Sequence, residues 1–334
     1  AASCGNKQDD LPAVVNFTEH IAPILYNKCT VCHRPGGSAH FSLVTYVEAA
    51  RSAGVSAFVV REKMMPPWPA DPNYTHFIGE RVLTSRETKL FEKWARDGVI
   101  EGPKDKLPPL PAYPFGSLLG TPDIRIPVQP IFLQKNSSDK FLLVKIPYEL
   151  PSDTFASLIE FIPGHRNVVH HVNGDMVSFE DAKKKNVFEG LQVANMAEDT
   201  ATLLLAYIKL GLQNDDGSFP LLQKSVVNYL PGVMGQKYPA GLGGYKLSRK
   251  GAFLLNDLHY GFTKNEDIWD SSFINIFLTK GPLNRPVQEF QLGTIGLSPV
   301  EPDLIILPNT VKPVWSKFTV PYDISILTIN PHMH

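Results

Sequence analysis

A five-residue stretch near the start of the chain, Cys29-Thr30-Val31-Cys32-His33, constrains its fold more than any other feature. Two cysteines separated by two residues, with a histidine directly after the second, form the attachment sequence for a c-type haem. Each thiol adds across one haem vinyl group, and the adjacent imidazole then lies under the iron as its proximal ligand. We therefore expect one covalent haem c, attached at Cys29 and Cys32 and ligated by His33.

Two other kinds of site also use paired cysteines. A thioredoxin-like redox pair would need a βαβ context, and a zinc site would need two further ligands at a suitable spacing. The chain has three cysteines, and the third, Cys4, lies near its start, so no second pair is left for zinc. Neither alternative explains the histidine that follows the pair, and the haem interpretation is favoured.

The stretch Met64-Met65-Pro66-Pro67-Trp68 supplies a candidate for the second axial ligand of the haem. Two prolines prevent a helix from continuing and stiffen the backbone that would present a methionine sulfur to the iron. Methionine ligation raises the haem potential, which suits electron transfer, and we predict Met65 as the ligand. Taken alone, two methionines before prolines are more often packing residues. The alternative ligands are His20, His40 and His76.

Helical periodicity surrounds the attachment sequence and predicts a small all-α cytochrome c domain over residues 14–102. A first apolar period over residues 21–28 leads directly into the first cysteine. A second helix is expected over residues 43–53, closed by Gly54. The clearest helix covers residues 84–97, because it opens with the spacing of a capping box, carries one apolar face and is followed by a glycine.

The N-terminal stretch Ala1-Ala2-Ser3-Cys4-Gly5 resembles the end of a bacterial lipoprotein signal, in which small residues precede an acylated cysteine. The polar and acidic residues that follow suit a flexible tether, which we place at residues 1–13, and resemble the export tag of some cell-surface lipoproteins. Haem attachment and lipidation both imply export. We therefore expect an outer-membrane lipoprotein, facing the periplasm or the cell surface and lipidated at Cys4; the alternative is a free cysteine in a disordered tail.

Composition excludes two classes of function. The formal net charge of −1 gives no electrostatic basis for a nucleic-acid partner. No run of eighteen or more apolar residues could form a membrane-spanning helix. The 29 prolines favour a β-rich, loop-rich architecture. Several of them fall in residues 103–119, which we expect to be a stiff, extended linker.

Beyond the linker, the pattern changes to mainly-β domains of the jelly-roll or sandwich type. We expect a first β domain over residues 120–290 and the start of a second, incomplete one over residues 291–334. Residues 194–209 fit either an inserted helix or a buried strand. The strand-like segments, separated by Pro, Gly and Asn turns, are residues 141–146, 157–162, 252–260, 273–278 and 325–329.

Three groups of histidines lie in this β region. Neighbouring side chains in a regular strand point to opposite faces, so His170 and His171 could reach one ion only with a local twist or bulge. His259 lies on another strand-like run. The spacing of His332 and His334 places both imidazoles on one face of a strand. An all-imidazole set favours Cu, Zn or Ni over Ca or Mg.

The order of these histidines resembles that of the type II copper monooxygenases, which include the peptidylglycine α-hydroxylating and dopamine β-monooxygenases. The likeness extends to Phe161-Ile162-Pro163-Gly164 before the histidine pair and to Asn330-Pro331-His332-Met333-His334. The whole chain is similar to bacterial proteins in which a cytochrome c domain precedes such a copper module. Their haem domains carry motifs like those at residues 65–68 and 94–98.

The resemblance implies two copper sites. His170, His171 and His259 match the ligands of the electron-transferring copper, and His332 and His334 match two ligands of the copper that activates O2. The family completes the second site with a methionine farther along, so the sequence is expected to be incomplete. The implied activity is hydroxylation of a small-molecule or peptide substrate, with the haem, a redox partner protein or ascorbate supplying electrons.

Two other functions stay open. The chain could be a non-catalytic electron-transfer or structural surface lipoprotein, as a subunit of a larger assembly. A zinc or copper hydrolase ranks third, because no carboxylate accompanies the histidines at a useful spacing in the sequence.

Overall fold

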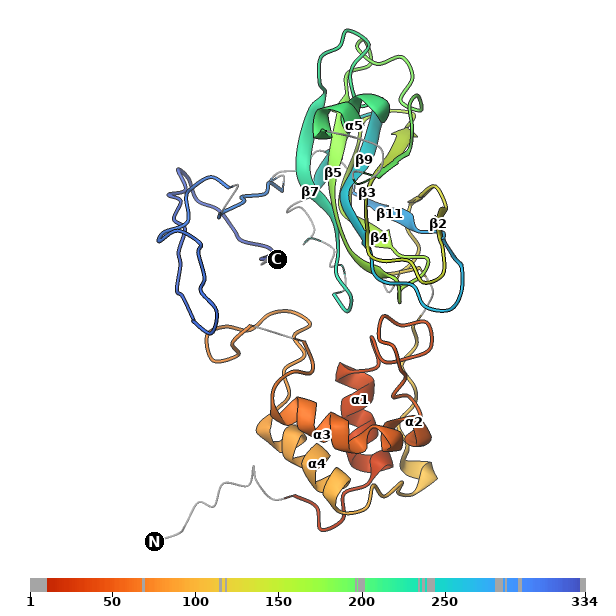
Figure 1. The fold of residues 1–334 in the computed structure, drawn as a ribbon, viewed down its shortest axis with the longest axis vertical. Coiled ribbons are helices and arrows are strands. Elements are labelled where there is room, and N and C mark those ends of the chain that lie inside the picture. The colour runs from red at the N-terminus through yellow and green to blue at the C-terminus, as the bar shows by residue number, and fades with distance from the viewer. Residues whose placement is uncertain are drawn as a thin grey trace.

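A computed structural model describes residues 11–67, 70–113, 116–117, 119–195, 197, 202–233, 235, 238, 244–279, 285, 287–293 and 296–330. Helices come first along the chain and strands follow (Figure 1). Strands hold 26% of the residues and helices 17%, so the chain is mainly β, as the sequence predicted. We call residues 11–113 the helical unit and residues 119–279 the β unit.

The helical unit is built around a compact apolar core that includes Phe17, Leu25, Phe91 and Trp94. These side chains lie at helical spacing and come from both ends of the unit, which brings the first and last helices together. The Trp94 indole nitrogen also donates to the Ile100 carbonyl at 2.9 Å. The elements are η1 (Phe17–Ile21), α1 (Ala22–Lys28), α2 (Tyr46–Arg51), α3 (Ala53–Arg61), α4 (Ser85–Arg96) and η2 (Lys104–Lys106).

The helix predicted at residues 84–97 is confirmed as α4, with its capping box. The Thr84 hydroxyl accepts from the Glu87 amide, and the Glu87 carboxylate accepts from the Thr84 amide. The single helix predicted over residues 43–53 is wrong. Two helices occupy this part, and Gly54, the expected stop, lies inside α3. Buried alanines at positions 53 and 57 allow α3 to pack closely, and this packing outweighs the low helix propensity of glycine.

The proline-rich segment packs back onto the helical unit in its first half, instead of leaving it as an extended linker. Lys104–Lys106 form a turn of 3-10 helix, η2. The Tyr113 hydroxyl lies 2.6 Å from the Thr30 hydroxyl, and the Arg34 guanidinium stacks 4.3 Å from the Tyr113 ring centre. These contacts hold Tyr113 against the cysteine-containing loop.

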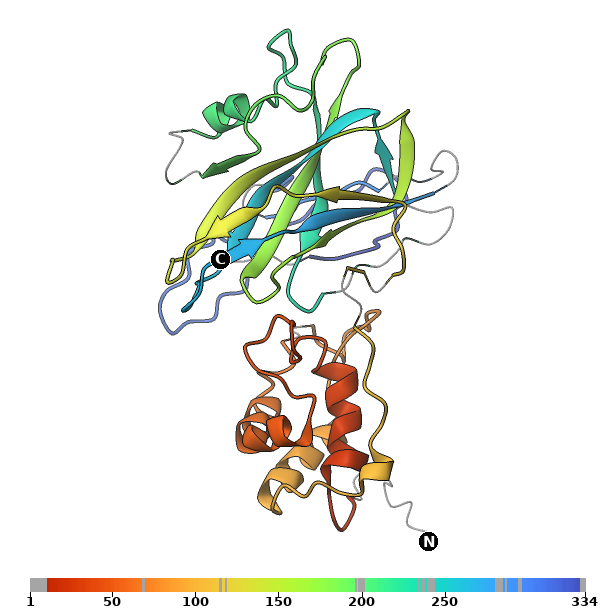
Figure 2. The same cartoon turned by 90° about the vertical axis from the view of Figure 1, so that its right-hand side faces the viewer.

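The β unit consists of antiparallel strands in two main sheets that face each other across one core (Figure 2). One sheet has the order β1-β11-β4-β8, the other β6-β3-β9-β5-β7, and β10 pairs with β2. Four predicted strands, residues 141–146, 157–162, 252–260 and 273–278, are confirmed as β3, β4, β9 and β11. The bounds are β1 (Ile124–Pro127), β2 (Ile131–Leu133), β3 (Lys140–Glu149), β4 (Thr154–Ile162), β5 (Val169–Phe179), β6 (Val193–Asn195), β7 (Leu221–Tyr229), β8 (Tyr245–Leu247), β9 (Lys250–Tyr260), β10 (Ile268–Asp270) and β11 (Phe273–Leu278).

The segment at residues 194–209 contains both elements between which the sequence left a choice. It begins in strand β6 and ends in helix α5 (Leu203–Lys209), which the Thr202 hydroxyl caps. The residues between these two elements lie largely outside the described part of the chain. Helix α5 covers the outer face of the larger sheet through a small second core that includes Ala206 and Leu210.

The strand predicted at residues 325–329 is wrong. Residues 296–330 lie beside the β unit (Figure 1), and their described pairing is an isolated bridge between Glu301 and Trp315. Apolar side chains such as Ile326 and Ile329 are 72% and 67% exposed. An isolated strand pair is at best marginally stable without a further layer to cover its apolar face.

Candidate metal centre

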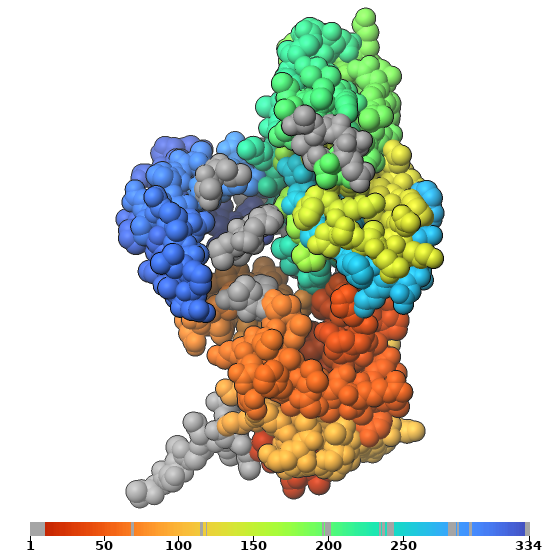
Figure 3. Space-filling model, in the orientation of Figure 1, coloured from red at the N-terminus to blue at the C-terminus, as the bar shows by residue number. Residues whose placement is uncertain are grey.

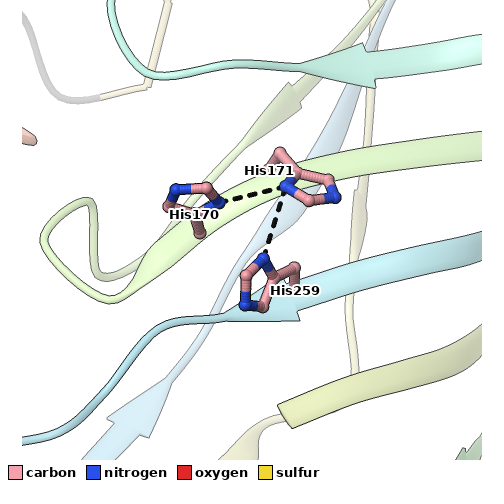
Figure 4. A group of neighbouring side chains, drawn as sticks. All are labelled: His170, His171 and His259. Atoms are coloured by element: carbon pink, nitrogen blue, oxygen red, sulfur yellow. Dashed lines mark hydrogen bonds between the residues drawn. The ribbon is translucent and has the colours of Figure 1, made fainter. Parts of the chain in front are cut away.

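Three histidines meet at one end of the larger sheet (Figure 4). His170 and His171 come from the start of β5, and His259 comes from the end of the neighbouring strand β9. Their ligand atoms all lie within 4.8 Å of one another. Among the described residues, no other group of three or more histidines, cysteines or carboxylates lies so close together. The His171 Nδ1 atom lies 3.1 Å from the His170 Nδ1 and 3.4 Å from the His259 Nδ1.

A bulge in β5 brings the two adjacent histidines to one site. The register between β5 and β9 shifts between Val169 and His171, so that His171 pairs with His259 and His170 is the extra residue. A bulge of this kind re-aims a side chain that a regular strand would send to the opposite face. This confirms the requirement drawn from the sequence. His171 and His259 are only 9% and 7% exposed, whereas His170 is exposed.

Two carboxylates bond to the far side of the histidine rings. The His171 Nε2 lies 2.8 Å from Asp257 Oδ2, and the His259 Nε2 lies 3.2 Å from Asp139 Oδ2. A neutral imidazole carries one proton, and a carboxylate accepts it at Nε2. The Nδ1 atoms of His171 and His259 therefore carry lone pairs, and these lone pairs point into the cluster.

The spacing of the nitrogens matches the requirement of a single ion. Imidazole nitrogens bind zinc at about 2.0–2.1 Å, so two ligands at a tetrahedral angle lie roughly 3.3 Å apart. The observed separations of 3.1 and 3.4 Å bracket that value. Converging lone pairs repel one another unless a proton or a metal cation lies between them. The residues therefore fit a metal ion bound through Nδ1.

The electrostatics of the cluster favour the uncharged ligand form. Burial, followed by the neighbouring rings of His259 and His171, holds the pKa of His170 below its usual 6.5. A metal competes with protons for imidazole nitrogens, so a lowered pKa leaves more of the histidine ready to bind. The Phe141 ring stacks on His259, with centroids 4.1 Å apart and planes 16° apart, and restricts rotation of that ligand.

The sequence did not identify Asp139, Asp257 or Phe141. The statement that no carboxylate accompanies the histidines is wrong, although both carboxylates contact outer nitrogens and leave Nδ1 for the ion. Asp257 could have been found, because it lies two residues before His259 on the same strand face. Asp139 and Phe141 reach the site only because β3 pairs with β9, where Phe141 lies opposite His259.

The predicted haem-attachment residues lie together on the turn after α1. The Cys29 carbonyl accepts from the amides of Cys32 at 3.1 Å and His33 at 3.0 Å. The His33 Nδ1 lies 3.2 Å from the Phe41 carbonyl, so a proton there would leave Nε2 as the free ligand atom. Burial raises the pKa of the Cys29 thiol to about 12. This arrangement fits two thioether links and one imidazole ligand on the same face of a loop.

The candidates for the second haem ligand differ in their surroundings. Met65 follows α3 and is 40% exposed, whereas Met64 is 58% exposed. Two of the alternative ligands have local partners. The His20 Nδ1 accepts from the Asn16 amide at 3.2 Å, and the His76 Nδ1 lies 2.8 Å from a Glu80 oxygen. Met65 stays the predicted ligand.

Several predicted site residues lie outside the described part of the chain. These are Cys4 and both members of the second histidine pair, His332 and His334. The structure therefore bears on the first predicted copper site only. Among the described helices, none has the length and apolar character needed to cross a membrane.

No protein-family model matches the sequence, and no curated protein matches it.

Proposed function

We propose that this chain is an exported haem- and copper-binding oxidoreductase that takes part in O2-dependent hydroxylation of a small-molecule or peptide substrate. The observation that carries the proposal is the convergence of three Nδ1 atoms from His170, His171 and His259. The motif from Cys29 to His33, which forms a turn after α1, would attach one haem c. Metal and haem in one chain support electron-transfer chemistry.

Copper is the metal that the ligand set favours. Imidazole nitrogens suit copper, zinc and nickel, and copper stands highest among the divalent first-row metals in affinity for such sites. His170, His171 and His259 would hold the ion, which supplies one-electron chemistry when bound. Among the described residues, no fourth histidine, cysteine or carboxylate offers a ligand atom to this cluster.

The surrounding residues hold these ligands in place. Asp257 and Asp139 accept protons at the two outer Nε2 atoms and so fix which nitrogen faces the ion. Phe141 stacks on His259 and excludes water from that face. Outer partners of this kind orient histidine ligands in metal sites generally. The resemblance to type II copper monooxygenases implies that this histidine set holds the electron-transferring copper.

The hydroxylation step rests on His332 and His334, which the resemblance assigns to the O2-activating copper. A second function, electron transfer without hydroxylation by a surface lipoprotein in a larger assembly, is favoured by the single histidine cluster of the described residues. O2 consumption distinguishes the two, because only the oxygenase couples oxidation of ascorbate or reduced haem to a hydroxylated product.

We also propose that Cys4 is lipidated. Lipidation would add the mass of acyl chains to the intact mass of detergent-extracted protein, and an unmodified thiol at Cys4 would contradict the predicted anchor.

The metal site is tested by copper stoichiometry and Cu(II) EPR on the full chain. We expect His171→Ala to lose the EPR signal of the three-histidine site. His165→Ala is the matched control, because His165 lies in the loop just before β5 and bonds to Asn167 at 2.6 Å instead of joining the cluster. If His171→Ala retains full copper, or the unaltered chain prefers zinc by a wide margin, the proposal is wrong.

A further inference from the structure

The turn that follows β7 contacts the haem-attachment loop. The Val233 amide donates to the Leu230 carbonyl at 3.0 Å and closes this turn. A Cβ atom added to Gly232 would lie 2.9 Å from the Cys32 sulfur and 3.1 Å from an Arg81 nitrogen. In Figures 2 and 3 the helical unit and the β unit meet on this side of the sandwich. Only a residue without a side chain can approach Cys32 so closely.

Cationic side chains gather around the same contact. Arg166, from the loop before the histidine pair, lies near enough to Arg34 to lower the pKa of that guanidinium, in addition to the larger effect of burial. Burial raises the pKa of Tyr229, and Arg166 opposes that rise. The Arg34 Nε atom is buried without a hydrogen-bond partner. Arg34 and Arg81 of the helical unit and Arg166 of the β unit therefore lie near this contact, where positive charge would favour the reduced haem.

The contact is connected to the three-histidine cluster through one strand pair. Tyr229, the last residue of β7, pairs with Val172 of β5, and Val172 follows the ligand His171 directly. Residues 229–233 therefore extend from the strand that borders the ligand strand. A turn so attached cannot move far without disturbing the end of the sheet at which the histidines lie.

We propose that residues 229–233, with Arg166, form a docking surface through which the β unit completes the haem pocket and raises the haem reduction potential. The inference rests on the proposed function, since it requires haem at Cys29 and Cys32. Docking removes the thioether edge from water and brings positive charge to it. Both effects favour ferrous over ferric haem, because the ferric form carries the extra positive charge.

A pair of glycines provides the critical test. Gly232 and Gly217 have φ of +81° and +82°, so an alanine at either position must adopt a left-handed φ that strains the backbone. Nothing lies within 4 Å of an added Cβ at Gly217, whereas Cys32 and Arg81 lie within reach at Gly232. Any difference between Gly232→Ala and Gly217→Ala therefore reports the contact with the helical unit and not the turn itself.

The experiment uses the full chain matured in a host that attaches c-type haem. We measure the haem midpoint potential and the rate at which a protease cleaves within residues 114–123. Gly232→Ala should lower the haem midpoint potential. It should also raise the cleavage rate about tenfold, because the added methyl group overpacks the contact and increases the population in which the two units are apart. Gly217→Ala should leave both unchanged. Arg166→Gln, which strains no backbone, should also lower the potential.

The outcomes separate this inference from the proposed function. Equal potentials and equal cleavage rates in Gly232→Ala and Gly217→Ala would overturn the docking surface, as would an unchanged potential in Arg166→Gln. If the unaltered chain carries no haem, the proposed function fails and the haem-pocket inference fails with it. If haem is attached but the two glycine variants have equal potentials and cleavage rates, only the docking surface is rejected and the proposed function stands.

Discussion

Replacing Asp257 by Asn tests whether the outer carboxylates set the metal affinity of the histidine cluster. Asp257 accepts the proton at His171 Nε2 at 2.8 Å, and this contact leaves Nδ1 as the inward ligand. An amide can instead donate to Nε2, which moves the ring proton to Nδ1, where the ion would bind. Loss of such an outer partner costs about 10- to 100-fold in metal affinity, or about 1.4–2.7 kcal/mol.

The two carboxylates are expected to differ in strength. The Asp139 contact to His259 is longer, at 3.2 Å, and the Asp139 side chain is 53% exposed, whereas that of Asp257 is 24% exposed. Water competes more effectively for the more exposed carboxylate and screens its charge. We expect Asp139→Asn to weaken copper binding in the same direction as Asp257→Asn, but by less.

The assay is competitive titration of copper against a chelator of known affinity, with Cu(II) EPR to report the number of nitrogen ligands. Asp105→Asn is the matched control, because Asp105 lies on η2 of the helical unit, away from the cluster. The reasoning is refuted if Asp257→Asn changes affinity by less than about twofold, or if Asp139→Asn has the larger effect.

Three further predictions concern the haem, a buried lysine and a helix cap. Met65→Leu should abolish the sulfur-to-iron charge-transfer band of the ferric haem, and loss of the band in Met64→Leu instead would place the ligand one residue earlier. Burial, together with the neighbouring Lys184, lowers the pKa of Lys145 to about 8. Between about pH 8 and pH 10.4, Lys145 is therefore more fully protonated in the unfolded chain than in the folded chain. The free energy of unfolding then rises with pH across that window. Lys145→Met should remove this rise in urea denaturation at about pH 7 and pH 10, and an unchanged slope would contradict the assignment. Thr84→Ala should lower the free energy of unfolding by about 1 kcal/mol, measured by thermal melting of the chain, because α4 loses its N-terminal cap; a change near zero would show that the capping box contributes little.

Much of the local structure followed from the sequence because the interactions involved are close in the chain. The capping box of α4 spans three residues, and the strands β3, β4, β9 and β11 carry the composition of buried sheet. The need for a bulge at His170 also followed from local geometry, since adjacent strand residues face opposite sides. In the same way, Asp257 lies two residues from His259 and could have been inferred.

Long-range pairing decided the rest. The split between α2 and α3, and the place of Gly54 inside α3, depend on how α3 packs against α4. Asp139 and Phe141 reach the histidines because β3 pairs with β9 across more than a hundred residues, and no periodicity encodes that choice of partner. The approach of Gly232 to Cys32 likewise joins segments two hundred residues apart. A sequence shows which side chains can bind a metal or a haem. Which of them share a site depends on the register of strands whose pairing is set by the packing of the whole core.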